Sequence, residues 1–394
     1  MHFAILCPPL TGHIKPLAAL AAELESRGHR ATFIHQVGAR HLVEGHGGTF
    51  APLPGSGLGA HKGVGGTVKE MARQTEMLCR EAPALLREFK VDAVIADQLE
   101  PAGALIAEKL GLPWISAACA LPINRDPAVP PPYVGWSYDP SDKGRKWAQG
   151  GWRVSDFLMR RLSRVIQAQS GGRWRNLDDA LSPLLQIAQA VPAIDFPRET
   201  LPGSFHYLGP WRRPSDDGFD PPGRSERPLV YCSLGTLQGG RVALFASIAA
   251  ACADLGLRLV LTHGGRLTRR EVESLPGRPF VFDYLPQEAV LAEADLVVTH
   301  AGFNTVLETL AAGLPMVALP IAFDQPAVAA RIARAGVGEV VRPSRATVNR
   351  LRAGIAKVLH EPAYRAAAQR VRAQIASAGG VRRAVDLVEE ALRS

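Results

Sequence analysis

The sequence predicts an α/β protein with two domains, each built on a parallel sheet that helices cover on both faces. Three observations predict this fold. Short apolar runs alternate with segments whose apolar residues recur at helical spacing. Residues 211–228 form a polar, charged stretch rich in proline and glycine, as linkers between domains often are. The chain has 394 residues, a length that suits two domains of ordinary size.

These observations divide the chain. We place an N-terminal domain at residues 1–212, a linker at 213–228 and a C-terminal domain at 229–394, whose last helix can pack back on the N-terminal domain. Ligands of parallel sheets bind beyond the carboxyl ends of the strands. The functional site is therefore expected in a cleft between the two domains.

In the N-terminal domain, the apolar runs predict strands, and segments with helical spacing lie between some of them. Leu17, Leu20, Ala21 and Leu24 recur at helical spacing after the first run, and Gly28 ends that helix. The expected strands are Phe3–Cys7, Ala31–Ile34, Val91–Ala96 and Trp114–Ala117, and the expected helices are Lys15–Ser26 and Ala102–Leu110.

The same alternation restarts after the linker. Apolar runs such as residues 296–299 predict strands that are buried on both faces. The expected strands are Leu229–Cys232, Arg258–Leu261, Phe280–Phe282, Leu296–Thr299 and Met316–Leu319, and the expected helices are Val242–Ala253 and Thr305–Ala312.

Residues 121–152 interrupt the alternation. They hold three consecutive prolines, three tryptophans and two tyrosines beside Lys143, Arg145 and Lys146. The aromatic content argues against disorder, so we expect a long functional loop. Aromatic rings and cations together are typical of a membrane interface, which predicts peripheral contact with a membrane through residues 121–152. The alternative is a loop that only covers a pocket for a soluble substrate.

Composition and charge narrow the function classes. The net charge of +8 suits an anionic phosphate or lipid, but the cations form no stripe interleaved with aromatic residues, so we expect no nucleic-acid partner. Five cysteines without a CxxC pair argue against a disulfide framework or zinc site and for a reducing compartment. We expect no signal peptide and no membrane span, hence a cytoplasmic protein that is at most peripheral at the inner face of the membrane.

Two residues at expected strand ends suit acid–base chemistry. His13 lies between the first strand and the first helix, where the positive end of the helix disfavours a charged imidazole, and a general base must be neutral. Asp97 ends the apolar run of a strand in the same sheet, from where it can hydrogen-bond His13 and stabilise the imidazolium. The alternatives are a packing or capping histidine and a helix N-cap aspartate.

The segment THAGFNTVLETLAAGLP, residues 299–315, joins a buried strand to a helix through a turn of small residues. Gly302 lets the backbone approach a ligand, and the N–H groups of the helix N-terminus attract an anion such as phosphate. His300 can donate to a phosphate oxygen, and Glu308 can accept from ribose hydroxyls. The alternative is an ordinary strand–helix turn with a solvated Glu308.

A second turn with similar chemistry is SLGTLQGG, residues 233–240. Its Ser233 and Thr236 hydroxyls and the Gly235 backbone suit an anion, although such turns are common after strands. The sequence contains neither a Walker A motif nor GxGxxG, which argues against ATP and NAD as ligands.

Residues 282–332 resemble the donor-binding signature of family 1 UDP-glycosyltransferases. The elements PQ, TH, GxN with a following Ser or Thr, E, GLP, P and DQ occur here in the family's order. The GHxxP at residues 12–16, the strand that ends in Asp97, and SLGT extend the resemblance over most of the chain. The resemblance implies the GT-B fold, in which two Rossmann-like parallel-sheet domains face each other across a cleft.

The resemblance also implies a role for each matching residue. His13 and Asp97 would form the catalytic dyad, and Tyr284 stands where the family usually has a tryptophan stacked on uracil. Ala301 and Phe303 also depart from the commoner residues, which leaves base specificity open. The other implied donor contacts are Gln287 near the base and ribose, Glu308 at the ribose, His300, Gly302, Asn304 and Thr305 at the diphosphate with Ser233 and Thr236 opposite, and Asp324 and Gln325 at the sugar hydroxyls.

A closer resemblance, to bacterial zeaxanthin glucosyltransferases, is carried by residues 70–81, 97–113, 118–127, 233–239 and 322–332. Several of these segments lie in the domain expected to bind the acceptor. The resemblance implies inverting transfer of glucose from UDP-glucose to a hydrophobic hydroxylated acceptor such as zeaxanthin. It implies no cofactor, because the UDP-sugar is a co-substrate, and the lack of a DxD pair in the sequence predicts that no metal is needed.

Three other functions stay open at this point. A glycosyltransferase of this kind can act instead on a soluble polyketide or flavonoid aglycone. A nucleotide-sugar 2-epimerase can share the architecture but needs neither an apolar acceptor pocket nor the dyad. A non-catalytic carotenoid- or lipid-binding protein explains residues 121–152 but not the donor motif.

Overall fold

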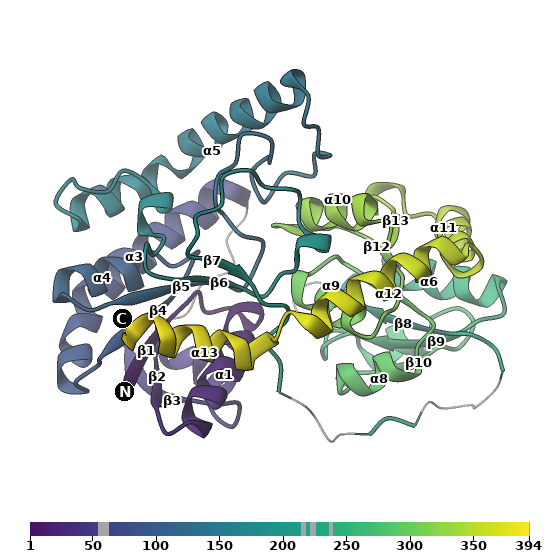
Figure 1. The fold of residues 1–394 in the computed structure, drawn as a ribbon. Coiled ribbons are helices and arrows are strands. Elements are labelled where there is room, and N and C mark those ends of the chain that lie inside the picture. Colours follow the sequence, from purple (N-terminus) through teal and green to yellow (C-terminus); the bar gives the residue numbers. More distant parts are fainter. Residues whose placement is uncertain (54–62, 214–217, 221–225, 236–238, 394) are drawn as a thin grey trace.

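A computed structural model describes residues 1–53, 63–213, 218–220, 226–235 and 239–393. It contains a seven-stranded sheet in the order β3-β2-β1-β4-β5-β6-β7 and a six-stranded sheet in the order β10-β9-β8-β11-β12-β13. Neighbouring strands pair in parallel in both sheets. Figure 1 shows the two sheets side by side, each flanked by helices, which confirms the predicted fold class.

Nine of the described strands lie within two residues of an expected apolar run at each end, whereas β3, β6, β7 and β13 were not predicted. The strands of the first sheet are β1 His2–Leu6, β2 Arg30–Gln36, β3 Thr49–Leu53, β4 Ala93–Asp97, β5 Trp114–Ala118, β6 Gln186–Ala188 and β7 Phe205–Tyr207. Those of the second sheet are β8 Leu229–Ser233, β9 Arg258–Thr262, β10 Phe280–Phe282, β11 Leu296–Thr299, β12 Met316–Ala318 and β13 Gly338–Val340. Every residue of β1, β4, β8 and β11 is buried, as expected for strands covered on both faces.

Helices connect the strands and cover both sheets (Figure 1). In the first half they are α1 Thr11–Ser26, α2 Arg40–Val43, α3 Gly63–Glu88, α4 Ala102–Leu110 and α5 Asp142–Gln169. In the second half they are α6 Val242–Asp254, α7 Arg269–Glu273, α8 Gln287–Glu293, α9 Phe303–Ala311, α10 Gln325–Ala335, α11 Val348–His360, α12 Pro362–Ser377 and α13 Gly380–Arg393.

Two sequence predictions are wrong in detail. The first helix begins at Thr11 instead of Lys15, so His13 lies inside its first turn and not before it. Residues 121–152 are not one loop, because α5 begins at Asp142 after Ser141, whose hydroxyl accepts from Gly144 N at 3.2 Å. The core-facing positions at this end of α5 are small residues, which leave a weak apolar pattern.

Two segments of the chain pack on the half of the molecule to which they do not belong in sequence. α13 packs on α1, and its Ala384, Val385 and Val388 belong to the core around the first sheet. Conversely, a short 3₁₀ helix, Pro192–Ile194, packs on the second half. Its N-cap Val191 and its last residue Ile194 lie in the core of the second sheet. The predicted domain bounds stay a prediction, since linker residues 214–217 and 221–225 lie outside the described residues.

Among the helices that the structure describes, none combines the length and the apolar composition needed to cross a bilayer. The five cysteines are free, buried thiols.

Candidate active site

His13 and Asp97 form a buried pair at the carboxyl edge of the first sheet. β4 ends at Asp97, and the first turn of α1 carries His13 beside it. His13 Nδ1 lies 2.8 Å from Asp97 Oδ2, and the two residues are 8 % and 2 % exposed. Asp97 Oδ1 also accepts from Leu99 N at 2.8 Å, so the carboxylate supports the following turn as well. Because Nδ1 is engaged, Nε2 is the nitrogen left to take a proton.

Charges around His13 favour its protonated form. Burial alone would lower the pKa of His13, but the charge and hydrogen bond of Asp97, with the charge of Asp324, raise it above its usual value. The net shift of the His13 pKa is thus opposite in direction to the effect that we expect of the helix N-terminus. The arrangement instead stabilises the imidazolium that a general base becomes.

Cys119 completes a compact buried group with this pair. Ligand atoms of His13, Asp97 and Cys119 all lie within 4.8 Å of one another. Burial, with the negative charge of Asp97, raises the pKa of the Cys119 thiol well above its usual value. Asp97 Oδ2 is hydrogen-bonded to His13, so we assign the His13–Asp97 pair to proton transfer and not to metal binding.

The predicted diphosphate site lies at the carboxyl end of β11. His300 follows the strand, and its ring fills the space next to Gly235 and Gly302, where a Cβ atom at either glycine would clash with it. Burial lowers the pKa of His300 to about 4, so the imidazole is neutral. Gly302 is the N-cap of α9 and supplies no side-chain cap, which leaves the first N–H groups of the helix for a ligand.

The turn into α9 has a strained backbone. Ala301 adopts a positive φ of 64°, a conformation that costs a non-glycine residue energy and is found preferentially at functional sites. Ser233, at the end of β8, is buried opposite this turn and accepts from Gly235 N at 3.4 Å. The predicted contact Thr236 lies outside the described residues. Thr305 lies in the first turn of α9, as predicted.

Asn304 joins the two halves of the molecule. Its Oδ1 accepts from Gln189 Nε2 at 2.6 Å, and its Nδ2 donates to the carbonyl oxygen of Gly12 at 2.8 Å. Gln189 Nε2 also donates to the carbonyl of Cys119. The Asn304 side chain thus holds α9 against the turn that carries the candidate base, and what it leaves for an anion is its backbone N–H.

The residues predicted for the base and ribose lie together around α8 and α9. Gln287 Nε2 donates to Glu308 Oε2. Burial raises the pKa of Glu308, and the positive charge of Arg212 acts against this. Tyr284 is 67 % exposed, with its hydroxyl bonded to Gly264 O at 3.1 Å, so its ring is accessible to a planar base.

The predicted sugar-binding pair begins α10. Burial raises the pKa of Asp324, while the charges of His13 and Arg331 act to lower it, so Asp324 and the candidate base interact across the two halves. Gln325 Oε1 accepts from Ile321 N at 2.8 Å and Ala322 N at 2.7 Å. Its oxygen is therefore used in the preceding turn, and its amide NH₂ is the group left to donate to a sugar hydroxyl.

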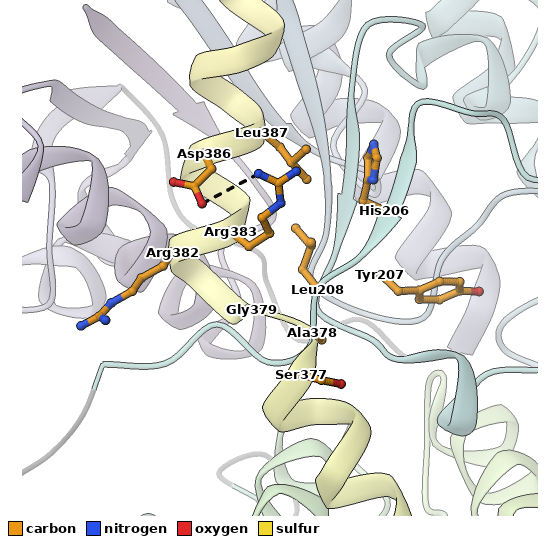
Figure 2. Close-up of a pocket in the computed structure, with 10 residues that line it drawn as sticks. All are labelled: His206, Tyr207, Leu208, Ser377, Ala378, Gly379, Arg382, Arg383, Asp386 and Leu387. Carbon is orange, nitrogen blue, oxygen red and sulfur yellow. Dashed lines mark ion pairs between the residues drawn. The ribbon is translucent and has the colours of Figure 1, made fainter.

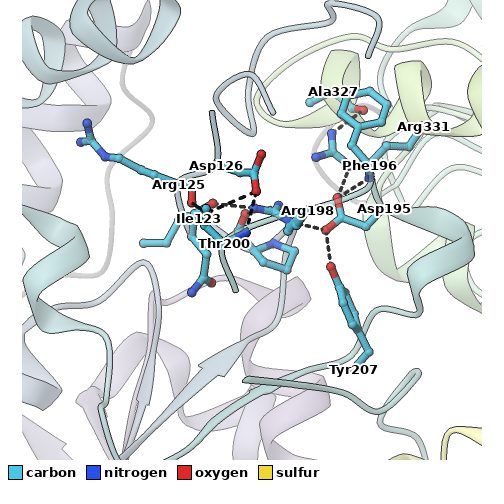
Figure 3. Close-up of polar contacts among 12 residues, drawn as sticks. Ile123, Arg125, Asp126, Asp195, Phe196, Arg198, Thr200, Tyr207, Ala327 and Arg331 are labelled. Atoms are coloured by element: carbon cyan, nitrogen blue, oxygen red, sulfur yellow. Dashed lines mark hydrogen bonds and ion pairs between the residues drawn. The ribbon is translucent and has the colours of Figure 1, made fainter. Parts of the chain in front are cut away.

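A buried ionic network joins Arg331 of α10 to Asp195, Arg198 and Tyr207 (Figure 3). Asp195 Oδ1 accepts from Arg331 Nε at 2.8 Å, and Oδ2 accepts from Arg198 Nε at 2.7 Å and the Tyr207 hydroxyl at 2.8 Å. The Arg331 guanidinium also stacks 4.2 Å from the centroid of the Phe196 ring. Burial alone would raise the pKa of Asp195, but the charges of Arg198 and Arg331 hold it well below its usual range.

This network connects α10 with the segment after β5. Arg198 donates to the carbonyl oxygens of Pro122, at 3.0 Å, and Asn124. Arg331 lies on α10 two turns after the predicted sugar-binding pair. The sequence analysis missed Arg331 and Asp195, because an arginine in an alanine-rich helix predicts a solvated surface residue. It also missed Gln189, for which no sequence motif gives a signal.

A separate cavity of ≈ 590 Å³ lies where the chain passes from α12 to α13 (Figure 2). Its lining includes His206, Leu208, Gly379, Arg382 and Arg383. It contains none of the residues predicted for the site, so we do not assign it to catalysis.

Two family models match the chain. The model for the glycosyltransferase family 28 N-terminal domain matches residues 11–122. The model for the erythromycin biosynthesis protein CIII-like C-terminal domain matches residues 247–390. The first match includes both members of the His13–Asp97 pair, and the second includes α9 and α10.

Similar proteins and structures cover nearly the whole chain. Zeaxanthin glucosyltransferase of Pantoea ananas is 41 % identical over 99 % of this chain and 96 % of its own length. Zeaxanthin glucosyltransferase of Pseudescherichia vulneris is 42 % identical over 99 % of this chain and 98 % of its own. In structure, the chain is similar to the glycosyltransferase of kitacinnamycin (TM-score 0.82, 24 % identity) and the calicheamicin glycosyltransferase (TM-score 0.80, 24 % identity), each over 99 % of this chain and 98 % of the other.

Proposed function

We propose that this chain, which belongs to the GT-B glycosyltransferase family that includes bacterial zeaxanthin glucosyltransferases, transfers glucose from UDP-glucose to a hydroxyl of zeaxanthin or a related hydroxycarotenoid. The observation that carries the proposal is the 41–42 % identity to two zeaxanthin glucosyltransferases over 99 % of the chain. That identity spans the half expected to bind the acceptor as well as the donor half.

The His13–Asp97 pair supports a role in activating the acceptor. His13 Nε2 takes the proton of the acceptor hydroxyl as its oxygen attacks C1 of the glucose. The 2.8 Å bond from His13 Nδ1 to Asp97 fixes the tautomer that leaves Nε2 free and stabilises the imidazolium afterwards. The raised pKa of His13 agrees with this stabilisation.

The turn at α9 supports a role in stabilising the leaving group. As the new C1–O bond forms, the bond from C1 to the diphosphate breaks and its electron pair stays on UDP. The uncapped N–H groups of α9 and the neutral His300 ring are fixed donors for that growing negative charge. Attack on the face of C1 opposite the diphosphate converts an α-linked glucose into a β-glucoside. The fixed donors stabilise the charge that a metal ion would otherwise neutralise.

Asp324 and Gln325 support recognition of the glucose hydroxyls. Asp324 interacts with His13, so a sugar bound by Asp324 would lie beside the base. A site that hydrogen-bonds a hydroxyl rejects an epimer, because its buried polar groups are then left unpaired. Replacing UDP-glucose by UDP-galactose tests this part of the proposal, and equal rates with the two donors would contradict it.

The proposed acceptor is a hydroxycarotenoid and not a soluble polyketide or flavonoid. We propose peripheral contact with the membrane at residues 121–152, which include the first turns of α5. A non-catalytic carotenoid- or lipid-binding role would leave the dyad and the donor turn without a purpose. Measuring UDP release with zeaxanthin and with soluble phenolic acceptors distinguishes these alternatives.

A further inference from the structure

The outer side of α5 carries a row of exposed apolar side chains. Trp147 and Val154 are 62 % and 59 % exposed, and Leu158 is 38 % exposed. The three are seven and four residues apart, which places them on one side of the helix. Phe157, beside this row, is 64 % exposed. The side of α5 that packs on the protein lies about a quarter turn from this row and carries Ala148, Gly151, Ser155, Leu162 and Ile166.

A row of cations runs beside the apolar row. Lys146, Arg153 and Arg160 are seven residues apart, and Arg164 continues the row one turn later, over about 27 Å of helix. The helix contains seven lysines and arginines but only two aspartates. One of these, Asp156, pairs with Arg125. Within the described part of the chain, Lys146, Arg153 and Arg164 have no ion-pair partner.

The apolar row begins next to the candidate active site. Trp147 makes an edge contact with Trp136, with ring centroids 5.9 Å apart. The preceding Gly135 lies so close to Pro326 of α10 that a Cβ atom on it would be 3.0 Å from the proline Cβ. Trp136, and the N-terminal end of α5 that it contacts through Trp147, are therefore close to the start of α10, where the predicted sugar-binding pair lies.

We propose that these two rows, residues 146–164 of α5, dock the protein on a bilayer that contains anionic lipid. The apolar row enters the boundary between headgroups and acyl chains, and the cations contact the lipid phosphates. The docking surface thus extends beyond residues 121–152 along most of α5, which forms one edge of the molecule (Figure 1). The inference rests on the proposed function in one respect, because an acceptor dissolved in a bilayer is reached at its surface.

Charge complementarity selects this occupant over a second copy of the chain. Two copies that met through α5 would bring the same unpaired cations together on proteins of net charge +8, and these would repel. An anionic membrane neutralises the cations while it covers the apolar row. Zwitterionic lipid offers the apolar part of this interaction only.

Sedimentation with vesicles tests the proposal without donor or acceptor. The protein is expected to bind phosphatidylcholine vesicles containing phosphatidylglycerol, more weakly as salt rises and only marginally without phosphatidylglycerol. The double variant Lys146→Glu, Arg153→Glu should bind at least about tenfold more weakly, since each cation near the surface contributes about fivefold. The matched control Arg270→Glu, Arg372→Glu makes the same charge change on other helices and should bind much more tightly than the α5 variant.

The apolar row is tested separately. Trp147→Ser combined with Leu158→Ser should reduce vesicle binding severalfold, whereas Leu184→Ser, at a leucine that is also 38 % exposed, should leave it unchanged. Each variant should still glucosylate an acceptor dispersed in detergent at the wild-type rate. If the wild type does not glucosylate the acceptor in detergent, the proposed function is contradicted. Binding to vesicles can still support the docking proposal in that case.

Three results would overturn the docking proposal: no binding of the wild type to phosphatidylglycerol vesicles, equal loss of binding in the α5 and control charge variants, or a dimer in analytical ultracentrifugation that Trp147→Ser dissociates. The last result would assign the α5 surface to contact between copies.

Discussion

His13 Nδ1 lies 2.8 Å from Asp97 Oδ2, although the two residues are 84 positions apart in the sequence. They meet because β1 and β4 are neighbours in the sheet, while the chain between them forms β2 and β3 on the other side of β1. The pair therefore lies at the point where the strand order reverses, which is where open parallel sheets bind their ligands.

The first prediction concerns the base. His13→Ala should lower kcat by ~10²–10⁴-fold, the usual contribution of general-base catalysis, and should leave UDP binding near normal. Steady-state kinetics and calorimetric titration with UDP measure the two effects. His360→Ala, at an exposed histidine, serves as the control. Near-wild-type turnover of His13→Ala would remove His13 from the mechanism.

The second prediction concerns pH. A general base acts in its neutral form, so kcat/KM should fall as pH drops through the pKa of His13, with a midpoint above 6.5. Asp97→Asn removes the charge that raises this pKa while burial still lowers it. The acidic limb of the profile should therefore move to lower pH and the plateau should fall. An unchanged midpoint in Asp97→Asn would show that the titrating group is not His13.

The third prediction concerns the buried network around Asp195. Arg331→Met should lower the free energy of unfolding by about 3 kcal/mol, the lower end for breaking a buried ion pair, because Arg198 and Tyr207 still bond the carboxylate. Urea unfolding followed by circular dichroism measures this change. Arg372→Met, at an exposed arginine of α12, should change it by less than about 0.5 kcal/mol. Equal unfolding midpoints for the two variants would contradict the assigned role.

The fourth prediction concerns metal ions. Glucosyl transfer should continue at an undiminished rate after dialysis against EDTA, because the α9 N–H groups and His300 are permanent donors to the diphosphate. Loss of the reaction after chelation and its return with Mg²⁺ or Mn²⁺ would mean that a cation performs this task.

Most of the fold follows from the sequence because parallel strands are continuous apolar runs. The runs at residues 3–7, 280–282 and 296–299 match β1, β10 and β11 to within a residue or two. Among the helices that were not predicted are α3 and α5, whose core-facing positions include polar or small residues such as Gln74, Gly151 and Ser155. Their helical state depends on packing against each other, which a local pattern does not contain.

The residues of the candidate site also divide into those that the sequence predicts and those that it does not. Residues at strand ends, such as His13, Asp97 and His300, are predictable because topology collects them at one edge of each sheet. The connections between the halves are not. Asn304 bonds Gln189 and Gly12, and Arg331 bonds Asp195, through contacts that exist only once the two halves are packed together.

The most direct test of the central claim is product analysis after incubation of the purified protein with UDP-glucose and zeaxanthin dispersed in detergent. We expect zeaxanthin monoglucoside and then diglucoside, since both ring ends carry a hydroxyl, with β-anomeric protons in the NMR spectrum and one UDP released per glucose transferred. No glucosylated zeaxanthin, beside rapid UDP release with a soluble phenolic acceptor, would contradict the carotenoid acceptor, and α-linked products would contradict the inverting mechanism.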